Sequence, residues 1–170
     1  MTIDELFEQM TEDQKKAGCF FDDLTGAYNR KALMAEYKEG DVIAIFDLDS
    51  LKWVNDNHGS HIADMLLQQL VERLSNSITP PIKVYRLSGD EFAIIQPPRI
   101  INRVVLEASK GFDVFSFGIG KSIPDADRSL KVGKAIREKF GARSGRGIAP
   151  PWADQLNSIV QQAKRIEGVA

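Results

Sequence analysis

The stretch "DVIAIFDLD" at residues 41–49 decides the fold, because a short apolar run rich in β-branched residues ends there in carboxylates. Its length and composition are typical of a strand buried on both sides, at the centre of a sheet. Asp47 and Asp49 follow at the C-terminal end of this predicted strand. Two acidic side chains are therefore held at one edge of the predicted core.

A second pair of apolar runs predicts a β-hairpin. "IKVYRL" (82–87) and "EFAIIQ" (91–96) flank a three-residue turn, and two prolines follow at 97–98. The turn places Asp90 beside Glu91. Adjacent like charges repel, so this is either an ordinary solvated turn or a site that binds a positive group.

The rest of the chain alternates helical and strand patterns in the order β-α-β-β-α-β, with a helix added at each end. This order predicts an α+β fold of the split βαβ, ferredoxin-like kind, with an antiparallel sheet and helices on one of its faces, as in polymerase palms. The expected helices lie at 4–18, 30–40, 51–78 with a break near "NHGS", 99–111 and 152–168. A last strand is expected at 112–122, and residues 126–147 are expected to form a basic helix that runs into a flexible, glycine-rich segment. The expected organisation is an N-terminal helix (1–20), one catalytic domain (21–149) and a C-terminal helix (150–170) packed on the same domain.

Composition narrows the function classes. The chain is 43% apolar and 27% charged, which is ordinary for a soluble globular domain. A net charge of −2 argues against a nucleic-acid or anionic-membrane binder, and no apolar run approaches the length of a membrane span. One cysteine, Cys19, allows neither an internal disulfide nor a thiolate metal cluster. With no secretory signal pattern at its start, the sequence is expected to be cytoplasmic.

The predicted fold brings Asp47 and Asp90 together, because the end of the first strand and the hairpin turn are neighbours in a split βαβ sheet. With Glu91 close by, they form an all-oxygen site suited to Mg²⁺ or Mn²⁺. Such a site supports displacement at phosphorus.

Several motifs together resemble the GGDEF-domain diguanylate cyclase family, here with the variant signature "RLSGDEF" (86–92). "DDLTGAYNR" (22–30) resembles the family's D-x-L-T-G-x-x-N-R motif, and "DLDSLKWVNDNHGSHIADMLL" (47–67) resembles its D-x-D-x-F-K-x-x-N-D block. "SFGIG" (116–120) and "ADRSLKVGK" (126–134) resemble the following strand and helix. Spacing kept over several motifs is specific, whereas one motif alone is weak.

The resemblance implies a metal-dependent enzyme that condenses two GTP molecules into cyclic di-GMP and releases pyrophosphate. Asp47 and Asp90 would hold the metal ions, assisted by the backbone carbonyl of Leu48. Glu91 would support the metal site or help to deprotonate a 3′-hydroxyl. Because each site would bind one GTP, catalysis would need a homodimer, stable or transient.

The resemblance also implies the residues around the nucleotide. Asn55 and Asp64 would read the guanine edge, and Lys52 and Lys134 would neutralise the triphosphate. Further residues placed beside the nucleotide are Leu51, Ser88, Gly89 and Arg146. Three arginines are alternative candidates for the second positive side chain that contacts phosphate: Arg137, Arg143 and Arg146.

Two departures from the family pattern affect the interpretation. Ser88 replaces a glycine, which would be strained if the turn needed positive φ. Thr79 and Ile82 occupy the positions of the R-x-x-D product-inhibition motif, so feedback inhibition through it is expected to be absent. The alternatives are a catalytically degenerate GTP- or cyclic-nucleotide-binding regulatory module, or a palm nucleotidyltransferase that makes another nucleotide.

Overall fold

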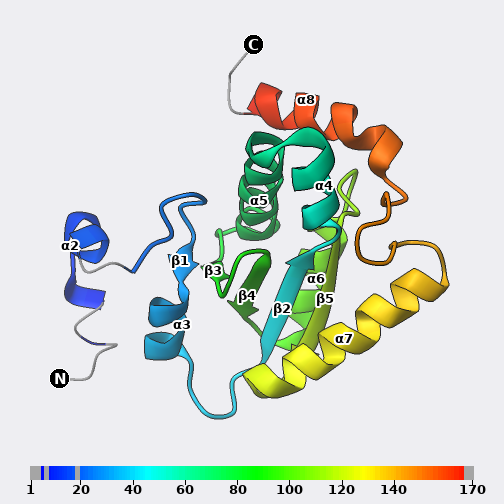
Figure 1. Cartoon of the computed structure of the whole chain (residues 1–170). Coiled ribbons are helices and arrows are strands. Elements are labelled where there is room, and N and C mark those ends of the chain that lie inside the picture. Colours follow the sequence, from blue (N-terminus) through cyan, green and yellow to red (C-terminus); the bar gives the residue numbers. More distant parts are fainter. Residues whose placement is uncertain (1–4, 6–7, 18–19, 167–170) are drawn as a thin grey trace.

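The computed structural model describes residues 5, 8–17 and 20–166. Its centre is a five-stranded sheet with the strand order β1-β3-β4-β2-β5 (Figure 1). The strands are β1 (Tyr28–Asn29), β2 (Ile43–Leu48), β3 (Tyr85–Arg86), β4 (Glu91–Ile95) and β5 (Phe115–Gly120). β2 pairs antiparallel with β4 on one side and with β5 on the other. The predicted α+β fold with a central first strand and a neighbouring hairpin is confirmed.

Helices connect the strands and extend the chain after them. They are α2 (Glu12–Ala17), α3 (Arg30–Glu36), α4 (Leu51–His58), α5 (Ser60–Ser75), α6 (Pro98–Ala108), α7 (Ile123–Lys139) and α8 (Leu156–Ile166), with a 3₁₀ turn at Ala153–Gln155. The predicted break between α4 and α5 falls at Gly59, whose φ of 86° is readily adopted by glycine. Cys19 and part of the predicted N-terminal helix lie outside the described residues.

The sheet is covered on both faces, so the prediction of helices on one face was wrong. Phe46 and Leu48 of β2 pack in one apolar cluster with α5, α6 and α8. Ile43 and Ile45, which point the other way along the strand, pack with α3 and α7. All six residues of β2 are buried, as a continuous apolar strand requires.

The short strand β1 was not predicted, because its two residues lie in a segment that has turn and capping residues. It pairs parallel with β3, which makes the sheet mixed rather than wholly antiparallel. The capping prediction holds at its end, where the Asn29 side chain accepts a hydrogen bond from the N–H of Ala32 and starts α3.

The C-terminal helix α8 packs across α5 (Figure 1). Leu156, Ile159 and Val160 are buried in the main cluster, together with Trp152 just before the helix. In the described part of the chain, no helix has the length and apolar content needed to cross a bilayer.

Candidate active site

Asp47 and Asp90 line one pocket of about 300 Å³ at the end of β2. The two strands deliver them there, because Asp47 and Glu91 are direct partners in the β2–β4 ladder and the Leu48 N–H donates to the Asp90 carbonyl oxygen. The whole lining is Asp47, Leu48, Ser50, Leu51, Lys52, Trp53, Asp90, Lys134, Arg143, Ser144, Gly145, Arg146 and Gly147. The pocket therefore joins acidic groups from the sheet with basic groups from α7 and the loop after it.

The Asp47 carboxylate is nearly buried and contacts the Lys134 ammonium at 2.7 Å. Burial raises its pKa to about 6. The hydrogen bond from Lys134 opposes this shift, and the neighbouring charge of Asp90 adds to it. Lys134 thus pairs with a carboxylate at the pocket, and its role toward a triphosphate stays a prediction.

The N-terminus of α4 opens onto the same pocket. Ser50, which precedes the helix, has φ of 61°, and among the described residues it is the one non-glycine with positive φ. Its side chain does not cap the helix, and its buried hydroxyl has no hydrogen-bond partner within the described chain. Uncapped backbone N–H groups at a helix N-terminus favour an anion such as phosphate.

The turn that bears the signature accommodates serine without strain. Ser88 has no positive φ, since outside glycine such values in the described chain are confined to Ser50. Its hydroxyl donates to the Glu91 carboxylate at 3.1 Å. Ser88 therefore helps to fix Glu91.

Replacing Ser88 with glycine is expected to change the free energy of unfolding by less than about 1 kcal/mol, because one exposed hydrogen bond is lost. Urea unfolding of both forms would measure this. A larger loss would show that the serine side chain supports the turn in some further way.

Arg86 links the signature turn to Asp22 through hydrogen bonds. Its guanidinium donates to both carboxylate oxygens of Asp22, at 3.0 and 2.9 Å, and to the carbonyl of Gly89 at 2.6 Å. Burial alone raises the pKa of Asp22, but hydrogen bonds from Thr25 and the pairing with Arg86 outweigh it and hold that pKa below its usual value. This contact explains why the sequence has an acidic residue at the start of "DDLTGAYNR".

Replacing Asp22 with asparagine is expected to destabilise the fold by about 1 kcal/mol at pH 7, because a partly exposed ion pair is lost. The lowered pKa of Asp22 means that its contribution is complete above the unfolded-state pKa and disappears as the pH falls through the folded-state value. The difference in urea midpoint between the two forms should therefore shrink progressively below about pH 4. A difference that does not change with pH would assign the effect to packing.

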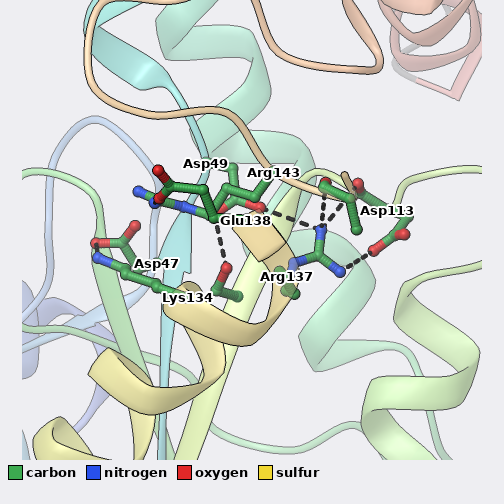
Figure 2. Close-up of polar contacts among 9 residues, drawn as sticks. Asp47, Asp49, Asp113, Lys134, Arg137, Glu138 and Arg143 are labelled. Carbon is green, nitrogen blue, oxygen red and sulfur yellow. Dashed lines mark hydrogen bonds and ion pairs between the residues drawn. The ribbon is translucent and has the colours of Figure 1, made fainter. Parts of the chain in front are cut away.

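A third carboxylate, Asp49, is fully buried and does not line the pocket. Figure 2 shows it beside Arg137 and Arg143. It accepts hydrogen bonds from the Ser116 hydroxyl at 2.7 Å, from Arg143 Nε at 2.9 Å and from Arg137 Nη2 at 3.1 Å. Burial raises its pKa, and the Ser116 hydroxyl and the two guanidinium groups oppose that shift. Arg137 also contacts Asp113 and does not line the pocket, whereas Arg143 does.

Not every predicted residue lies in the lining. Asn55, on α4, donates from its amide to the Leu51 carbonyl, and Asp64 is half-buried on α5. Ser88, Gly89 and Glu91 belong to the adjoining turn and strand. Their roles toward a nucleotide stay predictions.

The oxygen donors at the pocket fit a hard divalent cation whose coordination shell is completed by substrate phosphates and water. Among the described residues, no three histidine, cysteine, aspartate or glutamate side chains gather into a metal site by themselves. Magnesium, however, usually takes only one or two protein carboxylates, together with waters and substrate phosphates. Asp47, Asp90 and the carbonyl of Leu48, all at the pocket, are the groups that could hold it.

Comparison with known proteins shows the family to which the chain belongs. The family model described as "Diguanylate cyclase, GGDEF domain" matches residues 19–110, more than half of the chain. The chain belongs to the GGDEF family. It is 32% identical to the diguanylate cyclase VdcA of Vibrio cholerae over 108 residues, and 34% identical to the probable diguanylate cyclase DgcI of Escherichia coli over 113. These alignments cover 57% and 61% of this chain, but only 30% and 25% of the two relatives.

Solved structures show the same fold. The diguanylate cyclase SiaD of Pseudomonas aeruginosa, solved with its activator SiaC, matches with a TM-score of 0.60 at 21% identity, over 79% of this chain and 66% of that one. The coiled coil and GGDEF domain of DgcB from Caulobacter crescentus, in complex with c-di-GMP, matches with a TM-score of 0.58 at 21% identity, over 83% and 90%.

Proposed function

We propose that the protein is a diguanylate cyclase that converts two GTP molecules into cyclic di-GMP and two pyrophosphates. The observation that carries the proposal is the shared pocket of Asp47 and Asp90, bordered by the start of α4 and by Lys134, Arg143 and Arg146. Carboxylates beside clustered cations match a divalent metal bound together with a triphosphate. The relatives named above are diguanylate cyclases, known or probable.

The residues of the chain would have three kinds of role: metal binding, phosphate binding and proton transfer. Asp47, Asp90 and the Leu48 carbonyl would hold Mg²⁺ or Mn²⁺, which when bound neutralises phosphate charge and polarises the phosphoryl group. Lys52, Lys134 and the α4 N-terminus would bind the triphosphate. Glu91 would receive the proton of the attacking 3′-hydroxyl.

The reaction would join two sites. In each step the 3′-oxygen of one GTP bonds to the α-phosphorus of the other, and the bond from that phosphorus to pyrophosphate breaks. Two steps close the ring. Since one pocket would present one nucleotide, two copies of the chain would have to face each other to bring the reacting atoms together. Asn55 on α4 and Asp64 on α5, which lie outside the pocket lining, would bind the guanine base.

The deciding experiment incubates the purified protein with Mg²⁺ and either GTP, ATP or a mixture, and identifies products by chromatography and mass spectrometry. We expect cyclic di-GMP from GTP, and a rate per chain that rises with protein concentration because two copies must meet. Binding of GTP without turnover at high protein concentration would instead support a regulatory module. A mixed or adenine-containing product would support a different nucleotidyltransferase.

A further inference from the structure

The loop after α7 turns back toward the pocket. Gly141, with φ of 72°, ends the helix in a left-handed conformation. The N–H groups of Ala142 and Arg143 then both donate to the carbonyl of Arg137, at 2.8 and 3.2 Å. This reversal brings Arg143 over Asp49 at the end of β2 (Figure 2).

The two arginines that contact Asp49 differ in what else they bind. Arg137 is engaged by the Asp113 carboxylate at 2.9 Å and also contacts the backbone carbonyl of Ala142. Arg143 donates from Nε to Asp49, and among the described residues its outer nitrogens make only a long contact, 3.4 Å from Nη1 to Glu138. Arg143 thus has one edge fixed in the protein and the other only weakly held beside the pocket.

Glu138 lies one helical turn after Lys134 on α7. Its carboxylate is half exposed and has Arg143 as an ion-pair partner. A triphosphate in the pocket would meet the same guanidinium and would be a stronger, doubly hydrogen-bonding acceptor for it. Glu138 and phosphate therefore compete for one cation.

We propose, on the basis of the cyclase function above, that Arg143 binds the triphosphate and that Asp49 is the positioning residue that aims it. Asp49 holds Nε, which leaves the Nη edge directed to the substrate. Glu138 occupies that edge until nucleotide arrives. This gives a role to a buried carboxylate that is itself outside the pocket lining.

The test compares two nucleotides that differ in their phosphates. We would measure by calorimetry the Kd of GMP and of a GTP analogue with a methylene group between the α- and β-phosphorus atoms, which cannot release pyrophosphate. Arg143→Gln should weaken binding of the analogue about ten- to a hundredfold while changing GMP binding by less than about threefold. Arg128→Gln, at an exposed arginine of α7 that pairs with Asp125, is the matched control and should change neither.

Two further variants test whether Asp49 and Glu138 act on nucleotide binding through Arg143 rather than through the stability of the fold. Asp49→Asn should weaken analogue binding in the parent but add nothing in the Arg143→Gln background. If Asp49→Asn fails to fold, Glu138→Gln carries the test: it should tighten analogue binding about two- to fivefold in the parent and leave it unchanged without Arg143.

Equal weakening of GMP and analogue binding, or no change, in Arg143→Gln would overturn the proposal. The cyclase function is judged separately by product formation from GTP. A parent that makes cyclic di-GMP but binds the analogue equally well without Arg143 would contradict only this inference. A phosphate-selective loss in a chain that makes no cyclic di-GMP would contradict only the cyclase.

Discussion

Replacing Asp90 with asparagine is expected to lower the rate of cyclic di-GMP formation roughly a thousandfold, because the change removes one of two carboxylates available to a divalent cation. Asp90 is a partly exposed turn residue whose backbone carbonyl accepts from Leu48. Asparagine keeps the shape of the side chain and this backbone contact. The variant should therefore fold with a Tm close to that of the parent.

A metal-free measurement tests the same geometry. Burial is the main cause of the raised pKa of Asp47, and the charge of Asp90 adds to it. In the Asp90→Asn variant, the pKa of Asp47 should fall below its parent value of about 6, as NMR titration of the carboxyl carbon would show. An unchanged pKa would mean that the two carboxylates do not interact.

The matched control is Asp127→Asn, which removes an aspartate of α7 that pairs with Lys131 and does not line the pocket. Its rate should stay within about twofold of the parent, as expected for an exposed ion pair. If Asp90→Asn kept more than about a tenth of the parent rate, the proposed metal site would be wrong.

The strands and the helix break could be predicted because each depends on a short local sequence pattern. The apolar run before Asp47 and the two runs around Asp90 each fix a strand, and the split βαβ order makes those strands neighbours. The structure places both carboxylates in one pocket accordingly. Gly59, at the predicted interruption, likewise separates α4 from α5.

What could not be predicted depends on long-range contacts. Asp49 binds two arginines that are distant in the sequence: Arg137 lies 88 residues after it and Arg143 lies 94 residues after it. No periodicity in the sequence links these arginines to Asp49. The basic, glycine-rich stretch at 126–147 gave no signal for the direction in which the chain turns after α7 ends at Lys139. The two-residue β1 is too short for any alternation to show.

The sharpest structural prediction concerns Gly118 in the middle of β5, where the strand packs directly against α7. A Cβ atom there would lie 2.1 Å from the backbone nitrogen of Leu130 and 2.4 Å from the carbonyl oxygen of Ala126. Both are backbone atoms of α7, so no side-chain rotation relieves the clash, and the helix must move. Gly118→Ala is expected to lower the free energy of unfolding by about 3 kcal/mol or more, which for a chain of this size corresponds to roughly 6–12 °C in Tm.

Gly133→Ala, on the facing side of the same contact, is the comparison that makes this prediction specific. Its Cβ would meet one atom, the carbonyl oxygen of Phe117, at 2.9 Å, and alanine is favoured over glycine within a helix by up to about 1 kcal/mol. The helix preference offsets part of this milder clash, so its Tm should fall less than that of Gly118→Ala. Because α7 also carries Lys134, any folded Gly118→Ala protein should lose the Lys134–Asp47 contact as well as stability. Equal melting temperatures for the two variants would show that α7 does not lie as close to β5 as the structure places it.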